Sequence, residues 1–304
     1  MTLSLQNIMS LFSRPRRCRR GGPAFAVVIA VMMAVMATTA TAAASLRPEG
    51  TAEKLGYRQG DSIAYIPARV RQIPDFCFAG CEGLRRVVFE EGSQCAVISD
   101  YAFAYCEDLE EIEVPPTLAG IKEGAFRGCR SLRTLQLPDR IQIIPKSAFA
   151  DCRSLDLERL PASLREIGAL AFVDCASLTL DSIPRGVSKI GNNAFARCFA
   201  LSDIVLPARC EEVGSYAFAD CTNLRRLVLP ARCRMLGELI VSGCRSLRLI
   251  ESPALVPPSV ECASSLFEPD DDASWRDCRV IVPPGRVDSY RQSRFWERFE
   301  NITD

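Results

Sequence analysis

The sequence predicts a β-rich solenoid of about eight 23-residue coils, in which equivalent strands of successive coils form a parallel sheet. The motif Phe-x-x-Cys-x-x-Leu recurs along the chain, and its cysteines stand mostly 23 residues apart. An aliphatic residue precedes the aromatic by five positions in every copy. After each cysteine, apolar and polar residues alternate over a short segment that often ends in proline. A fixed period of this length is typical of repeat proteins, whose units bury apolar surface only against their neighbours.

The first 44 residues differ from the rest of the chain. Five arginines cluster between Arg14 and Arg20, the apolar run Ala24 to Ala37 follows, and small residues lead on to Ala44. This order of charged, apolar and small residues is that of a secretory signal, so we expect export and cleavage. An uncleaved membrane anchor is the alternative, because the run through Ala44 approaches the roughly 20 residues of a membrane span. We assign residues 1–44 to a signal peptide or anchor.

Residues 45–63 are expected to form an N-terminal cap, and residues 64–252 carry the repeats. The repeated cysteines are Cys81, Cys106, Cys129, Cys152, Cys175, Cys198, Cys221 and Cys244. The aromatics three residues before them are Phe78, Phe103, Phe126, Phe149, Phe172, Phe195 and Phe218, with Val241 in the eighth copy. The aliphatic residues five before the aromatic are Ile73, Ile98, Ile121, Ile144, Ile167, Ile190, Val213 and Leu236.

Within one repeat, the segment after the cysteine is the predicted strand. Its apolar residues recur with period two, as in Leu132–Pro138 and Leu224–Pro230, which predicts a strand with one face inward. The closing proline cannot donate to a ladder and ends the pairing. The stretch ahead of the aromatic often contains glycine and is interpreted as a turn. Stacking would then place Phe on Phe, Cys on Cys and Leu on Leu inside the solenoid.

Two departures from the pattern are informative. The first two aromatics are 25 residues apart, and the extra residues fall in the loop-like stretch Glu90 to Ser93. In copies four and five, the apolar residues after the cysteine are spaced differently, as in Leu155-x-Leu157-x-x-Leu160. We therefore expect these two strands to sit differently from the others.

The repeat Pro-x-x-aliphatic-x-x-Ile-Gly-x-x-Ala-Phe-x-x-Cys-x-x-Leu resembles the BspA-like leucine-rich repeats of bacterial surface proteins. The resemblance covers about residues 64–304, because the tail from Val282 through Trp296 to Ile302 is similar to the family's C-terminal cap. It implies a leucine-rich repeat solenoid of the β-rich α/β class, curved, with its parallel sheet on the concave face. Residues 253–304 would form a last partial coil and the C-terminal cap. The family has no shared catalytic residues.

Fifteen cysteines in an exported chain raise the possibility of disulfides or a metal site. Eight of them occupy one repeat position, and Cys77, Cys95, Cys210 and Cys233 replace apolar residues of other copies, so packing explains twelve. Paired Cys-x-x-Cys spacing is missing, which disfavours zinc. Cys210 with Cys233, and Cys262 with Cys278, are the pairs that we would test first as disulfides. We expect most of the repeated thiols to be reduced.

The composition disfavours catalysis and nucleic-acid binding. Histidine is absent, which removes the commonest general base and metal ligand. Basic and acidic residues number 37 each, so no net charge favours nucleic acid or an anionic membrane. The acidic run Asp270 to Asp272 is interpreted as a solvated loop rather than a calcium site. We expect no cofactor and no metal. A hydrolase that acts on surface glycans through paired carboxylates is a remote alternative.

We expect a partner to bind along the outward side of the predicted sheet, since solenoids commonly use such extended surfaces. The candidate partner-binding residues are Arg86, Glu111, Glu113, Thr134, Gln136, Arg159, Asp203 and Arg226. Their mixed charge defines no class of ligand. The function that we predict is a non-catalytic one at the cell surface or outside the cell, in adhesion or in binding of proteins or other surface macromolecules. A membrane-tethered structural scaffold is the alternative, and contact with a membrane would then run only through an uncleaved N-terminal segment.

Overall fold

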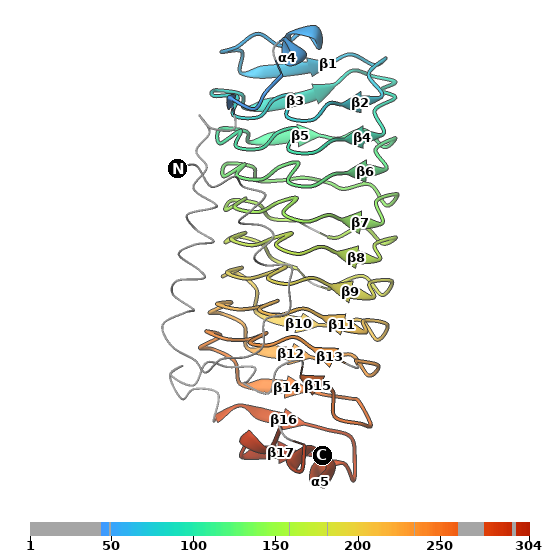
Figure 1. Cartoon of the computed structure of the whole chain (residues 1–304), viewed down its shortest axis with the longest axis vertical. Helices are drawn as coiled ribbons and strands as arrows, with labels where there is room; N and C mark the ends of the chain where they lie inside the picture. The colour runs from blue at the N-terminus through green and yellow to red at the C-terminus, as the bar shows by residue number, and fades with distance from the viewer. Residues whose placement is uncertain are drawn as a thin grey trace, which may run out of the picture. The chain divides into compact units, whose positions relative to one another are not determined.

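Each coil contributes up to two short strands, and the computed structural model stacks equivalent strands in parallel ladders (Figure 1). It describes residues 44–48, 50–157, 159–180, 182–233, 235–260, 277–293 and 296–304, all of one structural unit. Nearly all of the expected signal peptide or anchor, Cys262 and the run Asp270 to Asp272 lie outside these described residues. The stack has about nine turns and little helix, which confirms the predicted solenoid.

The first ladder is the predicted one and contains the segments that follow the repeated cysteines. Its strands are β1 (Ile63–Ile66), β3 (Arg86–Phe89), β5 (Glu111–Glu113), β10 (Asp203–Val205), β12 (Arg226–Val228), β14 (Leu249–Glu251), β16 (Arg279–Ile281) and β17 (Asn301–Thr303). Of these, β1, β16 and β17 extend the ladder at its two ends. Equivalent residues pair in register, as Arg86 does with Glu111 and Asp203 with Arg226. In β12 the middle residue Leu227 is buried between two half-exposed neighbours, as the period of two predicts.

A second ladder lies just ahead of the predicted turn before the aromatic, at positions for which we predicted no strand. Its strands are β2 (Gln72–Ile73), β4 (Val97–Ile98), β6 (Gly120–Ile121), β7 (Ile143–Ile144), β8 (Glu166–Ile167), β9 (Lys189–Ile190), β11 (Glu212–Val213), β13 (Met235–Leu236) and β15 (Ser259–Val260). The aliphatic residue five before the aromatic closes each of the first eight strands and faces the core. Two residues are too few to show an alternating pattern, so these strands had no signal in the sequence. A further tight turn, between the two ladders, follows the proline, as where Cys210 N–H donates to Pro207 O over 2.8 Å.

The strands of copies four and five do sit differently. In the described residues, the first ladder has no strand between Glu113 and Asp203, and only single bridges join Glu111 to Thr134 and Thr134 to Asp156. Thr134 is the second residue after its repeat leucine, whereas Asp156 is the first, so the register shifts by one residue. The shift turns Leu157 inward, where it is buried. The altered spacing of apolar residues thus predicted the place of the irregularity.

The third side of each coil is the turn around the aromatic, and it also forms backbone hydrogen bonds to the next coil. Phe103 N–H donates to Ala125 O over 2.8 Å, and Phe149 N–H donates to Ala171 O over 2.9 Å. All non-glycine residues with positive φ in the described part lie two residues before or two after the aromatic position of a repeat. Because residues with positive φ recur at these positions of the turn, every second backbone N–H points at the following coil. Apart from the breaks between β6 and β7 and between β5 and β10, successive described coils are therefore joined on three sides by backbone hydrogen bonds.

The core consists of side-chain columns that run the length of the stack. The rings of Phe78 through Phe218 stack nearly parallel, with 5.5 Å between the centroids of Phe126 and Phe149 and an interplanar angle of 2°. The repeated leucines, the aliphatic residues of the second ladder and the repeated cysteines are buried beside them. The predicted columns of Phe, Cys and Leu are present. Each coil covers the apolar surface of the next, so the solenoid buries its core through contacts between neighbouring repeats.

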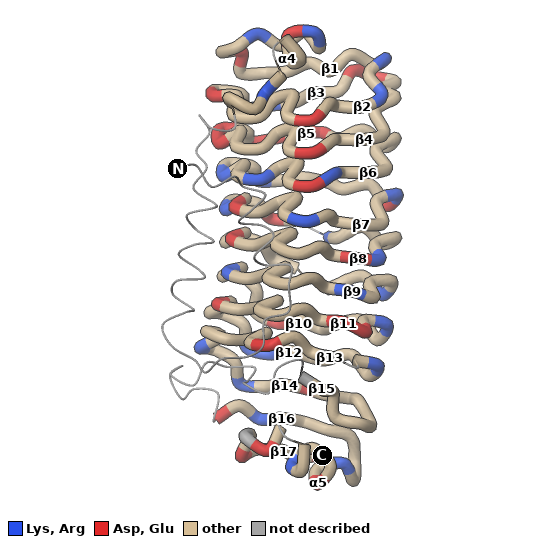
Figure 2. The backbone as a smooth tube through the Cα atoms, viewed as in Figure 1, with Lys and Arg blue, Asp and Glu red and all other residues tan. Residues whose placement is uncertain are grey.

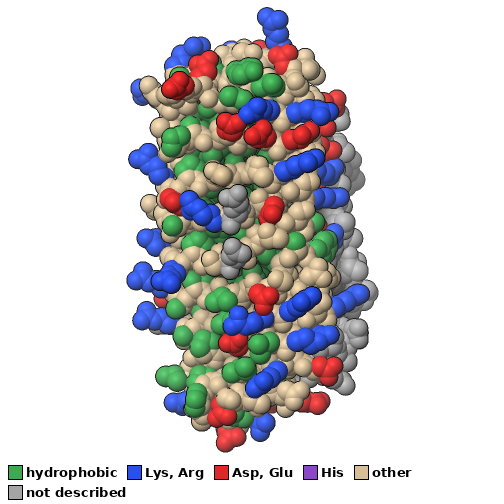
Figure 3. Space-filling model, turned by 180° about the vertical axis from the view of Figure 1, so that it is seen from behind, with side chains coloured by type: hydrophobic (Ala, Val, Ile, Leu, Met, Phe, Trp, Pro, Cys, Tyr) green, Lys and Arg blue, Asp and Glu red, His purple; other side chains and the backbone are tan. Residues whose placement is uncertain are grey.

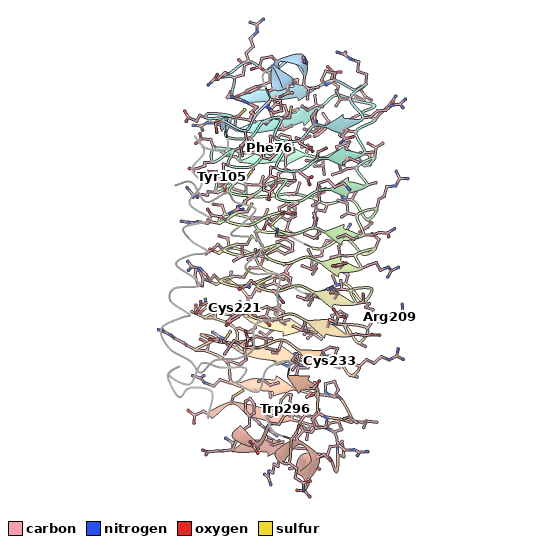
Figure 4. The ribbon with its side chains drawn as sticks, viewed as in Figure 1. Phe76, Tyr105, Arg209, Cys221, Cys233 and Trp296 are labelled. Carbon is pink, nitrogen blue, oxygen red and sulfur yellow. The ribbon has the colours of Figure 1, made fainter. Side chains whose placement is uncertain are left out.

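Short helices and aromatic side chains close the two ends. At the N-terminal end, α4 (Thr51–Lys54) buries Ala52, and Tyr57 packs edge-on against Phe78 with 5.6 Å between ring centroids. At the C-terminal end lie α5 (Val287–Arg291) and η2 (Trp296–Arg298). The buried indole N–H of Trp296 donates to Pro258 O over 3.2 Å (Figure 4). None of the helices in the described ranges is long and apolar enough to span a bilayer.

Candidate binding surface

The outward side chains of the first ladder form one continuous surface, which we call the strand face (Figure 3). It comprises the first and third residues of each three-residue strand and their equivalents in β1, β3 and the irregular coils. The structure places seven of the eight predicted partner-binding residues on it, namely Arg86, Glu111, Glu113, Thr134, Gln136, Asp203 and Arg226. Each of them is half-exposed or exposed, so the period of two assigned their direction correctly.

The eighth predicted residue, Arg159, lies off the ladder. It follows the irregular strand of copy four, and its guanidinium binds Asp139, in the turn before the preceding coil's second ladder, with 2.7 Å between Nη1 and Oδ1. The hydrogen bond from Arg159 lowers the pKa of Asp139, and both groups are well exposed. An exposed pair of this kind contributes little to stability. Arg159 is therefore a loop residue beside the strand face.

At the N-terminal end of the strand face, one arginine is shared by two carboxylates. Arg86 Nε lies 3.2 Å from Glu111 Oε2 on the neighbouring strand, and Arg86 Nη2 donates to Glu113. The hydrogen bond with Glu113 and the charge of Glu111 raise the pKa of Arg86. All three side chains stay accessible to solvent. The arrangement fixes a guanidinium between two carboxylates and leaves one negative charge in excess.

Toward the C-terminal end the same positions carry more arginine. Arg226 Nε binds Glu251 Oε1 over 2.7 Å, diagonally across β12 and β14. Arg279, on β16, donates to the Thr303 hydroxyl over 3.2 Å. Charged residues of both signs occur along the stack, as the colouring of the backbone shows (Figure 2).

The strand face also exposes apolar side chains that the sequence analysis did not select. Tyr65 on β1 is 59% exposed and Val205 on β10 is 44% exposed, while Val88, Val228 and Leu249 are partly exposed. Their signal was available in the sequence, because each stands at an outward position of the alternating pattern. Tyr65 and Val205 are therefore the candidate apolar anchors among the charged side chains of this face.

The cysteine columns are unsuited to catalysis. The thirteen described cysteines are buried and carry thiols, including Cys210 and Cys233, the first suspected disulfide pair, and Cys278 of the second (Figure 4). Burial raises the pKa of Cys210, Cys221 and Cys278 to about 12, and that of Cys129 well above its ordinary value. A reactive cysteine needs an accessible thiolate, which burial disfavours here.

Carboxylates on the turn side of the coils are neutralised by arginine. Asp151 is buried between Arg130 and Arg153, at 2.9 and 2.7 Å. Asp174, one coil further, binds Arg197 at 2.6 Å, and burial nevertheless raises its pKa. This row offers no pair of free acids of the kind that a glycan hydrolase uses. Among the described residues, no group of three or more cysteine or acidic side chains is arranged to hold a metal ion.

The repeat matches a known family model, described as "BspA type Leucine rich repeat region (6 copies)", over residues 62–179 and 144–258. A leucine rich repeat protein of T. pallidum is 27% identical, with 61% of this chain and 83% of that chain covered and a TM-score of 0.48. A leucine rich cell surface protein of Faecalibacterium prausnitzii A2-165 is 22% identical, with 82% and 80% covered and a TM-score of 0.41. A pneumococcal vaccine antigen is 19% identical, with 80% and 79% covered and a TM-score of 0.42. No curated protein matches the chain.

Proposed function

The chain belongs to the BspA type leucine-rich repeat family, and from this premise we propose that it is a non-catalytic protein that binds other proteins through its strand face. Family membership supports a role in protein interaction. The observation that carries the choice of surface is the exposure of Tyr65 and Val205 among charged side chains of the first ladder. Apolar anchors surrounded by polar residues are the usual composition of a binding surface.

The rigid stack supports this mechanism of binding. Backbone hydrogen bonds join successive coils on three sides, so the outward side chains of the first ladder are held in fixed rows. A partner that contacts several rows meets a surface that is already ordered and loses little free energy to ordering it. A few anchors such as Val205 would then determine affinity, with the charges selecting the partner.

We place the protein at the cell surface or outside the cell. The arginine cluster, the apolar run and the small residues before Ala44 support export with cleavage of the signal. A membrane-tethered scaffold is the alternative if the segment stays attached. N-terminal sequencing of the exported protein separates the two, because an intact start at the arginine cluster means a tether and a start near residue 45 means release.

A capture experiment with matched variants tests the binding function. The purified protein would be immobilised and exposed to host and bacterial surface fractions, beside the variants Val205→Asp and Ile143→Asp. Ile143 is 51% exposed on the second ladder, so its variant makes the same chemical change on another side of the coil. We expect Val205→Asp to lose a protein that the wild type and Ile143→Asp both retain. Equal capture by all three forms would show that the strand face is not the binding surface.

A further inference from the structure

Charge is distributed unevenly along the stack, although the whole chain is neutral. Residues 82–113 contain nine acidic residues and two arginines, a net charge of −7. Residues 225–248 contain six arginines and one glutamate, a net charge of +5. The first window covers the coils of Cys81 and Cys106, and the second covers those of Cys221 and Cys244. The two ends of the repeat array therefore carry opposite charge.

The opposite charges stand at matching places in their coils. Glu82 directly follows Cys81, as Arg245 directly follows Cys244. Glu110 directly follows the repeat leucine of the second copy, as Arg225 does that of the seventh. The two residues also make the same backbone hydrogen bond to the preceding coil: Glu110 N–H donates to Arg85 O, and Arg225 N–H donates to Ser202 O. Both pairs lie beside the strand face; Glu82, Arg225 and Arg245 are exposed and Glu110 is half-exposed.

We propose that the strand face binds a second copy of this chain, with the two stacks antiparallel and related by a two-fold axis along the strands. Such an axis, midway between the coils of Cys152 and Cys175, exchanges the first copy with the eighth and the second with the seventh. It brings Glu82 opposite Arg245 of the other copy and Glu110 opposite Arg225. Because a two-fold interface repeats each contact, every one of these pairs forms twice.

The remaining contacts of this arrangement are compatible with association. Glu111 meets Arg226, Val205 of β10 meets Gln136, and Val228 of β12 meets Glu113. Among the described residues one like-charge pair arises, Arg85 with Arg248, and Arg85 Nη1 already binds Glu110 at 3.2 Å. Eight coils at about 4.8 Å and three residues of strand at about 3.3 Å give roughly 400 Å² per copy for the strands alone. A standard interface has about 800 Å² per partner, so the flanking side chains that include Glu82, Glu110, Arg225 and Arg245 have to supply the rest.

The inference rests on the proposed function, because it names the partner of the same surface. Two other occupants are outcomes of the test. Opposite charges at the two ends could join copies head to tail, which gives open chains instead of a closed dimer. A foreign protein could occupy the face, in which case the chain alone is a monomer.

Paired charge reversals test the proposal. Variant A carries Arg225→Glu and Arg245→Glu, so all four paired positions are acidic, and variant B carries Glu82→Arg and Glu110→Arg, so all four paired positions are basic. A control carries Arg209→Glu and Arg232→Glu, with the same change of charge as variant A in the turns before β11 and β13; Figure 4 shows Arg209 at the edge of the second ladder. Circular dichroism and thermal melting would establish that all forms fold. Mass would be measured by analytical ultracentrifugation on the full chain.

We expect wild type and control to form dimers, and A or B alone to dimerise at least about tenfold more weakly. An equimolar mixture of A and B should recover a 1:1 dimer, and about 0.5 M salt should weaken it because salt screens exposed charges. A monomeric wild type, no recovery on mixing, or open-ended oligomers would overturn the proposal. If the wild type is monomeric while Val205→Asp still loses a captured protein, the dimer is wrong and the proposed binding function stands.

Discussion

The thiol of Cys129 donates a hydrogen bond of 3.1 Å to the carbonyl oxygen of Phe103, in the preceding coil. The same carbonyl accepts the backbone N–H of Cys106, its own coil's cysteine, over 3.2 Å. The relationship recurs through the stack at Cys106, Cys152, Cys175, Cys198, Cys221 and Cys244, each bonded to a phenylalanine one coil back. The repeated cysteine is therefore more than a small apolar residue, because its S–H joins adjacent coils.

Substitution of Cys175 separates these two roles. In the protein, the Cys175 thiol lies 3.1 Å from the Phe149 carbonyl oxygen. Serine keeps a donor for that oxygen, whereas alanine removes it. We expect Cys175→Ser to be more stable than Cys175→Ala by about 1 kcal/mol of unfolding free energy, the usual net contribution of a hydrogen bond. Urea unfolding of both variants measures the difference. If the position required only an apolar group, serine would be the less stable variant.

The buried thiols should make the fold sensitive to alkaline pH. Because their pKa is higher in the folded state, folding holds the thiol proton more tightly. This contribution is complete below the unfolded thiol pKa of about 9 and is lost as pH rises toward about 12, the folded value for Cys210 and Cys221. Each thiol should lower the unfolding free energy by up to about 1.4 kcal/mol per pH unit in that range.

Unfolding in urea at several pH values between 8 and 10 checks this slope, before most tyrosines ionise. Replacing Cys210 and Cys221 by serine should make the slope shallower by up to about 1.4 kcal/mol per pH unit for each thiol removed. Stability that is independent of pH in this window, or an unchanged slope in the double variant, would contradict the account.

In the later copies, the glycine that follows the aliphatic residue lies close to the backbone of the preceding coil. A Cβ at Gly191 would lie 2.4 Å from the backbone nitrogen of Ala169 in the preceding coil. At Gly120, in β6, a Cβ would meet nothing within 4 Å. We expect Gly191→Ala to destabilise the protein by about 1–3 kcal/mol through overpacking and Gly120→Ala to change stability by less than about 0.5 kcal/mol. Thermal or urea unfolding tests the contrast, and equal effects at both sites would refute it.

The phenylalanine column should carry a large share of the stability. Phe149 is fully buried, with its ring centroid 5.5 Å from Phe126 and 5.4 Å from Phe172. Phe149→Ala removes a large side chain from a closed core and should cost about 3–5 kcal/mol. Phe199→Ala, at a half-buried position on the turn, is the control and should cost much less. Similar losses for the two variants would mean that the column is less tightly packed than it appears in the structure.

The repeat made much of this fold predictable, because identical residues in identical positions must share one environment. The columns of Phe, Cys and Leu, the parallel first ladder and the irregular strands around Leu157 all followed from the pattern. The second ladder did not, since a two-residue strand such as Val97–Ile98 has no periodicity to detect. The left-handed residues were also missed, although Gly128, Asp151 and Asn193 at those positions are the residue types that tolerate positive φ.

The sequence predicted which side chains of the first ladder point outward, but it did not predict all the residues that make up the candidate surface. Alternation assigned Arg86 and Asp203 to the outside, and it could equally have identified Val205. Arg159 was predicted on the strand face but lies beside it, because the one-residue register shift before it changes which residues occupy the outward positions. Glu82 and Arg245 occupy the same repeat position in the first and the eighth copy, and their proposed pairing depends on how the coils stack.

The central structural claim is that the cysteine columns are reduced, hydrogen-bonded packing elements and not a disulfide framework. A thiol titration of the denatured protein, with no reductant added, tests it most directly. We predict that at least the thirteen described cysteines react as free thiols. Almost no free thiol in the denatured chain would contradict the claim, because a cysteine in a disulfide has no S–H to donate to the preceding coil.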